Sequence, residues 1–147
     1  MGKNETNDEQ ICGSLDKNKE LVLKVAREGW NPVIVDKHCT DDYLMHYGGE
    51  KLDRENLKEF MGAIHHALPD LHFEIEDIIA ENDKVVTRWK AEGTHKKTFQ
   101  GVFPTNRKVS FSGITISRVK GEKIAEDWEE VDQLNFTQQF GVYPDDI

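Results

Sequence analysis

The chain has 147 residues and a formal net charge of −9, with 37% hydrophobic and 32% charged residues. This length suits one domain around a single core, and the acidic balance argues against a nucleic-acid partner, because phosphate binding needs clustered Lys and Arg. No apolar stretch approaches the roughly 18 residues of a membrane span, and two cysteines, Cys12 and Cys39, are too few for a disulfide framework. We therefore expect a cytoplasmic protein with no membrane partner.

The beginning of the chain predicts a disordered leader followed by a helix. Residues 1–13 are polar and show no hydrophobic periodicity, so we expect the leader to end there and a single domain to occupy residues 14–147. The helix is expected to begin near Ser14 or Asp16, because either side chain can accept hydrogen bonds from unpaired backbone N–H groups. Gly29 is expected to end it.

Two further helices and a short strand are expected before residue 70. Pro32 suits the first turn of a short helix, and a strand is expected over Tyr43–Tyr47. The next helix has clearer signals, because Asp53 can cap it and apolar residues then recur at i, i+3, i+4 and i+7. Pro69 is expected to stop this helix.

From Leu71 onward the sequence indicates mostly strands. They are expected at His72–Ala80, at Lys84–Thr94, in a short segment at Thr98–Val102 and in a hairpin over Val109–Asp132, before a closing helix at Asp132–Phe140. Helices followed by an antiparallel meander indicate an α+β fold. We expect a cone-shaped barrel, in which a curved, mainly antiparallel sheet wraps the N-terminal helices and leaves a pocket between them.

The hairpin carries the most informative chemistry of the chain. Its second strand holds four carboxylates around Trp128, namely Glu126, Asp127, Glu129 and Glu130. Strands usually avoid acids, because acids lose hydration when a strand face packs. Either this strand leaves one face solvated, or it points an acid into a cavity, where the acid can serve as a general base.

The turn at Lys120–Glu122 leaves two strand pairings open. A two-residue loop at Gly121-Glu122 puts Thr115 on the face of Trp128, whereas a three-residue loop puts Thr115 opposite Glu129. If Glu129 enters a pocket, desolvation raises its pKa towards the range useful for proton transfer. If it faces water, it is an ordinary carboxylate. The residues alone do not choose between these alternatives.

Four other residues are candidates for contact with a substrate. His46 and Tyr47 lie on the short strand, where His46 either shares a proton with a pocket acid or simply caps the sheet. Arg88 either holds a substrate oxygen or forms a cross-strand ion pair on the outer face. Trp89 is expected in the core, at an interface or against substrate. No two histidines stand at metal-ligand spacing and no glycine loop suits a phosphate, so no metal or cofactor is expected.

A set of motifs between Ala67 and Trp128 resembles a known family. In chain order the motifs are Ala67–Phe73, Asp83–Trp89, Gly93–His95, Phe99–Gly101, Val109–Gly113 and Glu126–Trp128. They resemble the SnoaL-like polyketide cyclase family, a branch of the nuclear transport factor 2-like superfamily of cone-shaped α+β proteins. The resemblance covers roughly residues 16–142. It defines the fold more closely than the activity, because this superfamily hosts many chemistries.

The resemblance implies a cofactor-free aldol cyclase with an acid in the cone. That acid follows the tryptophan of the last long strand and falls at Glu129, while the family's histidine position falls at Thr115, three residues before Arg118. This implies the pairing of Thr115 with Glu129 and favours the three-residue loop. Threonine hydrogen-bonds but does not shuttle a proton near pH 7. His46 is therefore a candidate for that role from across the pocket.

Three functions are compatible with these observations. The leading hypothesis is a cofactor-free acid/base enzyme that cyclises, isomerises or dehydrates a small apolar carbonyl or ester compound, with Glu129, Thr115 and His46 as catalytic residues and with Arg88, Tyr47 and Trp89 contacting substrate. The alternatives are a cone that binds a small ligand without chemistry and an interaction domain with an occluded cone. The resemblance also implies a homodimer formed through the outer face of the sheet, which apolar residues on that face support.

Overall fold

The polypeptide forms one six-stranded sheet with four helices. In this computed structural model residues 2–140 are described, together with the side chains of residues 15–132 and 135–140. The elements are α1 (Gly2–Arg27), α2 (Pro32–His38), β1 (Cys39–Tyr47), β2 (Glu50–Asp53), α3 (Arg54–Ala67), β3 (His72–Glu81), β4 (Lys84–Thr94), β5 (Lys108–Lys120), β6 (Lys123–Val131) and α4 (Gln133–Gln139). The strand order across the sheet is β2-β1-β6-β5-β4-β3.

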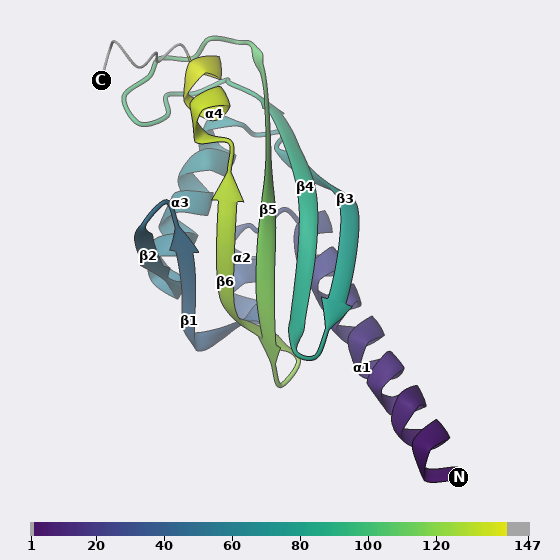
Figure 1. Ribbon diagram of the computed structural model, residues 1–147. Coiled ribbons are helices and arrows are strands. Elements are labelled where there is room, and N and C mark those ends of the chain that lie inside the picture. The colour runs from purple at the N-terminus through teal and green to yellow at the C-terminus, as the bar shows by residue number, and fades with distance from the viewer. Residues whose placement is uncertain (1, 141–147) are drawn as a thin grey trace.

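The sheet is curved, and helices α1, α2 and α3 cover one of its faces (Figure 1). All neighbouring strands are antiparallel except β1 and β6, which run parallel. The sheet begins at β2 and ends at β3, and these edge strands do not pair with each other. The expected α+β fold with a curved, mainly antiparallel sheet is therefore confirmed, but the barrel is not closed.

Three segments differ from the sequence-based expectations. Helix α1 begins at Gly2, so residues 2–13 are helical rather than a disordered leader. A segment without hydrophobic periodicity has no apolar face to bury. It can still form a helix, because Lys, Glu and Gln have high helix propensity. The assignment of one domain to residues 14–147 stays a prediction. The segment Thr98–Val102 is not a strand but contains a turn, with a single antiparallel bridge between Phe99 and Val102. Strand β2 was not expected, because its four residues carry little apolar pattern.

Helix α3 forms as its sequence predicts. The Asp53 side chain accepts a hydrogen bond of 2.8 Å from the backbone N–H of Asn56, which caps the helix. Leu57, Met61 and Ile64 are buried on one face, as their spacing indicates. This face packs towards the sheet, so α3 supplies part of the apolar wall described below.

The β5–β6 hairpin combines features of both pairings that the sequence leaves open. Its loop has two residues, Gly121-Glu122, which both have positive φ angles. The register then shifts by one residue beside Arg118, where Ala125 has no cross-strand partner and forms a bulge. Beyond the bulge Thr115 lies directly opposite Glu129. The expected pairing is therefore confirmed, and the expected three-residue loop is wrong, because the extra residue lies within the strand.

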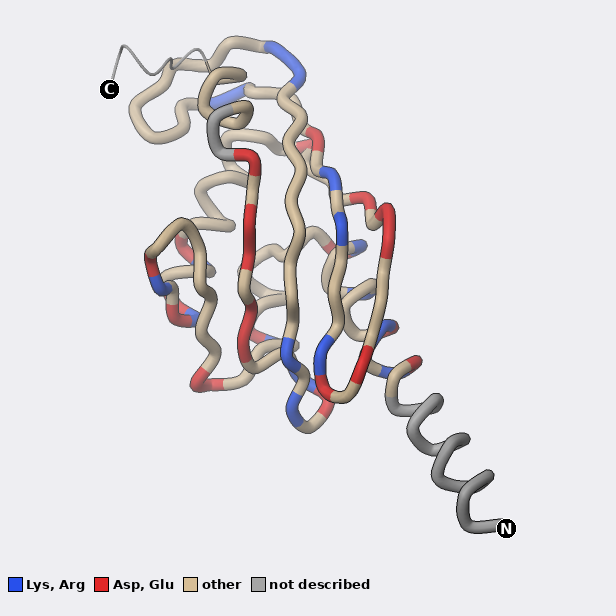
Figure 2. Tube along the Cα trace, in the orientation of Figure 1, with Lys and Arg blue, Asp and Glu red and all other residues tan. Residues whose placement is uncertain are grey.

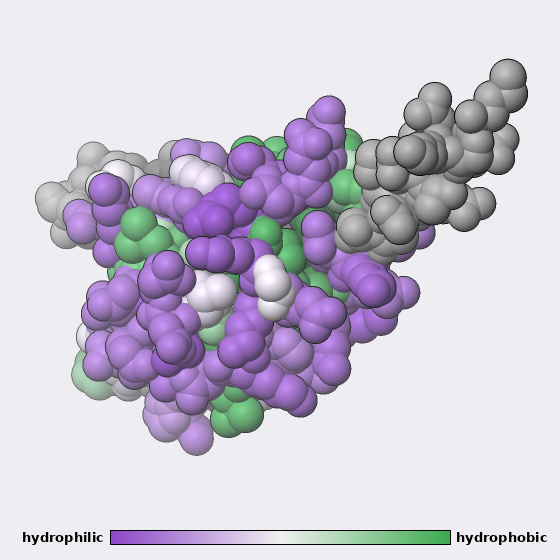
Figure 3. All heavy atoms as spheres, turned by 90° about the horizontal axis from the view of Figure 1, so that it is seen from below, coloured by the Kyte–Doolittle hydropathy of each residue, from purple (hydrophilic) through white to green (hydrophobic). Residues whose placement is uncertain are grey.

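Acidic and basic residues are grouped along particular strands of the sheet (Figure 2). Acidic positions follow β6 and β3, and basic positions lie on β4 beside β3 (Figure 2). The end of the molecule that carries the β3–β4 and β5–β6 turns is covered mainly by hydrophilic side chains (Figure 3). Within the described residues, every helix is too short or too polar to cross a membrane.

Candidate active site

A cavity of about 70 Å³ lies between the sheet and the helices. A single buried water needs on the order of 10–15 Å³, so this cavity can hold more than one water or part of a small molecule. Its walls are mostly apolar and include the rings of Phe60, Phe73, Phe111 and Phe136. Such a largely apolar hollow with a few polar groups is typical of a small-molecule site.

Four polar residues of the cavity wall form one cross-strand row. Thr87 on β4 pairs with Thr115 on β5, which pairs with Glu129 on β6, which in turn pairs with Tyr47 on β1. All four residues line the cavity. Of the described residues in its wall, Glu129 is the only one whose side chain is ordinarily charged at neutral pH. The register of the sheet therefore brings three of the six predicted site residues, Glu129, Thr115 and Tyr47, to one place.

Trp89, a fourth predicted site residue, supports this row through its indole N–H. Trp89 Nε1 donates a hydrogen bond of 2.9 Å to Thr115 Oγ1, and Thr115 Oγ1 donates one of 3.0 Å to Glu129 Oε1. An indole N–H can only donate, so the hydroxyl group must accept from Trp89 and give its single hydrogen to Glu129. This chain holds the carboxyl group in place at the cavity wall.

The environment of Glu129 favours its neutral form. Burial raises its pKa from 4.5 to about 7, the acidic side chain of Asp127 nearby adds to this shift, and the hydrogen bond from Thr115 opposes it. Glu129 keeps intermediate exposure, which we attribute to the cavity that it lines. A carboxyl group with a pKa near neutrality can both accept and donate a proton under ordinary conditions.

Asp127 is a second inward-facing acid, which the sequence analysis did not single out. It lies two residues before Glu129 on the same face of β6 and is 0% exposed. The Tyr43 hydroxyl donates a hydrogen bond of 2.5 Å to Asp127 Oδ2. Burial raises the pKa of Asp127 above its ordinary 3.8, while the hydroxyls of Ser117 and Tyr43 oppose this shift. Residues two apart on a strand face the same side, so an inward-facing Glu129 implies an inward-facing Asp127. The sequence therefore contained the information needed to predict this second acid.

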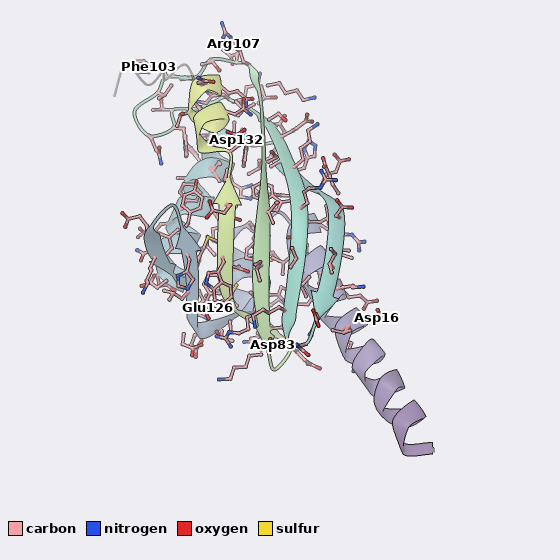
Figure 4. All side chains as sticks on the ribbon, in the orientation of Figure 1. Asp16, Asp83, Phe103, Arg107, Glu126 and Asp132 are labelled. Carbon is pink, nitrogen blue, oxygen red and sulfur yellow. The ribbon has the colours of Figure 1, made fainter. Side chains whose placement is uncertain are left out.

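His46 lies on the outer face of the sheet. It is adjacent to the inward-facing Tyr47 on β1, and strand alternation turns it the other way. His46 Nε2 lies 2.7 Å from Glu126 Oε2, and its ring stacks on Trp128 with centroids 5.3 Å apart. Glu126 is seen near the start of β6 in Figure 4. The expected position of His46 across the pocket from Glu129 is therefore wrong, and His46 is not among the residues that line the cavity.

Arg88 also lies on the outer face, one residue before the inward-facing Trp89. Its Nε and Nη2 each lie 2.7 Å from Asp77 Oδ2, and it also pairs with Glu76 on the same neighbouring strand. The cross-strand ion pair is therefore the alternative that the structure supports. Arg88 is not among the residues that line the cavity.

The residues around the cavity suit proton transfer. In the part of the chain that the structure describes, no three His, Cys, Asp or Glu side chains gather as metal ligands. The arrangement offers one acid with a raised pKa, a fixed hydroxyl that orients it, and apolar walls that limit water. Such a site can remove a proton from carbon and return it.

The sequence matches the model of the SnoaL-like polyketide cyclase family over residues 20–140, which is most of the chain. The chain belongs to the SnoaL-like polyketide cyclase family. No curated protein matches it in sequence. The resemblance described above implies an acid at Glu129, and in this SnoaL-like chain Glu129 lines the cavity.

Solved structures of similar proteins have the same fold. AclR, a candidate hydroxylase from Streptomyces galilaeus, is 26% identical with a TM-score of 0.80, over 88% of this chain and 99% of that chain. A candidate polyketide cyclase from Acidithiobacillus ferrooxidans is 29% identical with a TM-score of 0.74, over 85% and 94%. IdmH, a candidate polyketide cyclase from Streptomyces antibioticus, is 25% identical with a TM-score of 0.72, over 85% and 99%. Family and fold together support a cyclase- or isomerase-type function.

Proposed function

We propose that this SnoaL-like protein is a cofactor-free acid/base enzyme that acts on a small apolar carbonyl or ester compound through an enolate. The observation that carries the proposal is the Glu129 carboxyl group, which lines an apolar cavity and has a pKa raised to about 7. No lysine, arginine or histidine is found among the described residues of the cavity wall. An anionic substrate would therefore lose hydration without gaining an ion pair, which favours a neutral one.

The proposed reaction uses the two oxygens of Glu129 differently. Oε1 accepts the hydrogen bond from Thr115, which leaves Oε2 of the ionised carboxylate to take a proton from the carbon beside a carbonyl group. The electron pair of that C–H bond forms the enolate C=C bond, and the carbonyl electrons move to oxygen. Protonated Glu129 then gives that proton to the alkoxide formed when the enolate attacks a second carbonyl, to a different carbon of the enolate, or to the hydroxide that the enolate expels. These three outcomes are cyclisation, isomerisation and dehydration.

Hydrogen exchange tests this function before the natural substrate is identified. Small cyclic ketones would be incubated with the protein in D₂O, and the loss of their α-hydrogens would be followed by NMR. The wild-type protein is expected to accelerate exchange, and Glu129→Gln is expected to lower the accelerated rate by roughly 10²–10⁴-fold, the usual contribution of a general base.

Glu130→Gln is the matched control for this experiment, because Glu130 is the next residue on β6 but is exposed on the opposite face. It is expected to exchange ketone hydrogens at the wild-type rate. Full activity in Glu129→Gln would contradict the proposal, as would a wild-type rate equal to the solvent background for ketones that bind in the cavity.

A second function, the binding of a small apolar ligand without chemistry, is favoured by one observation. Thr115 stands where the resemblance places a histidine, and its hydrogen is committed to Glu129. Native mass spectrometry of the purified protein distinguishes the two functions. A ligand that is recovered unchanged, together with no catalysed exchange, would favour binding over catalysis.

A further inference from the structure

Ser117 and Asp127 form a second polar site next to Glu129. They lie directly opposite each other on β5 and β6, and they are 1% and 0% exposed. Ser117 also lines the cavity. Among the described residues, neither Ser117 Oγ nor Asp127 Oδ1 has a hydrogen-bond partner of ordinary geometry. Buried polar atoms without partners are costly and rare, so two of them side by side call for an explanation.

One shared proton can satisfy both atoms. Asp127 Oδ2 already accepts from Tyr43. A proton on Oδ1 can be donated to Ser117 Oγ, and the Ser117 hydroxyl hydrogen can then be donated into the cavity. In the opposite arrangement Ser117 donates to an ionised Asp127, and Oγ offers the cavity only lone pairs. The two arrangements therefore select opposite ligand groups, a hydrogen-bond acceptor or a donor.

The surroundings favour the proton on Asp127 when Glu129 is ionised. Asp127 has no exposure, and the groups that act on it are the hydroxyls of Ser117 and Tyr43 and the carboxylate of Glu126, none of which is a cation. Cys39, also packed nearby, has its pKa raised and stays neutral. Glu129 lines the cavity and accepts from Thr115. A single negative charge on the two acids is therefore less costly on Glu129.

We propose that Ser117, held by protonated Asp127, is the hydrogen-bond donor for the carbonyl oxygen of the substrate. This inference rests on the proposed function and adds the group that binds the reacting carbonyl. Asp127 acts through Ser117 and is a positioning residue. As the substrate proton moves to Glu129 Oε2, the negative charge moves from that carboxylate to the enolate oxygen, which accepts from the Ser117 hydroxyl. No proton leaves Asp127, and the net charge of the site is constant.

The spacing of these residues along β5 and β6 allows one substrate to contact both Ser117 and Glu129. Asp127 and Glu129 are two residues apart on β6, as Thr115 and Ser117 are on β5. Residues two apart on a strand lie roughly 7 Å from each other on one face. A C–C=O unit spans that distance when its oxygen contacts the Ser117 hydroxyl and its α-hydrogen contacts Glu129. The pair therefore selects neutral compounds with an acidic C–H beside a carbonyl group.

Isotope-edited infrared spectroscopy tests the donor without requiring turnover. The probe is cyclohexanone labelled with ¹³C at the carbonyl carbon, and a hydrogen bond lowers its stretching frequency below the value in hydrocarbon solvent. Ser117→Ala is expected to raise the frequency of the bound probe to the hydrocarbon value and to weaken binding roughly 3- to 10-fold. Ser112→Ala, on the exposed face of the same strand, is expected to change neither.

Asp127→Asn provides the second readout. Its side-chain amide can donate to Ser117 Oγ as the protonated acid does, so the low stretching frequency is expected to persist. An unchanged frequency in Ser117→Ala, or a wild-type protein that binds no ketone, would overturn the proposal. A hydrocarbon-like frequency in Asp127→Asn would overturn the role given to Asp127.

The two proposals fail in distinguishable ways. A stretching frequency that depends on Ser117, together with no catalysed exchange of ketone hydrogens, would refute proton transfer by Glu129 and support the donor site. Exchange of ketone hydrogens that depends on Glu129, together with a carbonyl stretching frequency that Ser117→Ala leaves unchanged, would support proton transfer and refute the donor site.

Discussion

The hydrogen-bond partners of Thr115 determine what its hydroxyl group can do in the site. Its hydroxyl accepts from Trp89 Nε1 and donates to Glu129 Oε1. Because the hydroxyl has only one hydrogen, Thr115 can orient Glu129 but has no hydrogen left for a substrate. A threonine at this position is therefore consistent with an enzyme in which Glu129 alone moves the proton.

The Glu129→Gln substitution is expected to remove a pH-dependent part of the stability. The folded-state pKa of about 7 lies above the ordinary 4.5, so protonation of Glu129 favours the folded state. This contribution is complete below about pH 4.5 and is lost as the pH rises through about 7. Each pKa unit corresponds to about 1.4 kcal/mol. The difference in unfolding free energy, wild type minus variant, should therefore fall by about 3 kcal/mol across this range, as measured by urea unfolding.

Above about pH 7 the same difference should stay constant, because Glu129 is then ionised in both folded and unfolded chains. Glu130→Gln serves again as the control, since Glu130 is exposed. A difference between wild type and Glu129→Gln that is flat from pH 4.5 upward would show an ordinary carboxylate and contradict the burial of Glu129.

Strand alternation decides which candidate residues reach the cavity. His46 and Tyr47 are adjacent on β1, and Arg88 and Trp89 are adjacent on β4, so only one of each pair can face inward. The sequence contains this restriction, and it excludes two of the six predicted site residues. Which member of each pair faces inward depends on the packing of the whole sheet, and the residues alone do not determine that.

At the scale of elements, the β5–β6 hairpin shows why loop length is an incomplete guide to register. Counting from the two-residue loop predicts that Thr115 faces Trp128, but the bulge at Ala125 restores the pairing with Glu129. A bulge depends on tertiary packing and leaves little trace in the local sequence. Helix α3, in contrast, could be predicted with its cap, because its signals are local.

Gly113 on β5 allows Trp89 to reach Thr115. An added Cβ at Gly113 would lie 2.6 Å from Trp89 Cζ2 and 2.7 Å from the backbone oxygen of Glu130. Gly113→Ala is therefore expected to displace the indole and to destabilise the protein by about 1–3 kcal/mol, the usual cost of overpacking. Urea unfolding measures the loss, and the exchange assay shows whether Glu129 is still held in place.

Gly62→Ala in α3 is the matched control, because its new Cβ meets only Pro32 Cγ at an ordinary 3.6 Å. Alanine favours a helix over glycine by roughly 0.5–1 kcal/mol, so this variant should be as stable as the wild type or more so. Wild-type stability in Gly113→Ala would show that Trp89 is not packed as closely as described.

At the scale of the whole molecule, the order of helices followed by strands predicts the α+β fold, while closure of the sheet could not be predicted from the sequence. The face of the sheet opposite the helices is open in Figure 1. It exposes large apolar side chains, since Ile114 and Ile116 on β5 are 50% and 37% exposed. Contiguous exposed apolar groups on a sheet favour association.

We propose that this outer face forms a homodimer. Ile116→Glu places a charge beside Trp128, its partner across β5 and β6, and is expected to convert the dimer to a monomer, because the charge would lose its hydration at the interface. Light scattering coupled to size-exclusion chromatography measures the mass. Val33→Glu, on α2 and 74% exposed, is expected to remain dimeric. A monomeric wild-type protein would contradict this proposal.

The pH dependence of ketone exchange tests the role of Glu129 most directly. The rate constant for α-hydrogen exchange would be measured from about pH 5 to 9 for the wild type and for Glu129→Gln, after subtraction of the solvent background. If Glu129 is the base, the wild-type rate rises with pH and levels off above a pKa of about 7, and the variant shows no such rise. A wild-type profile that is already level at pH 5, or the same profile in Glu129→Gln, would contradict proton transfer by this residue.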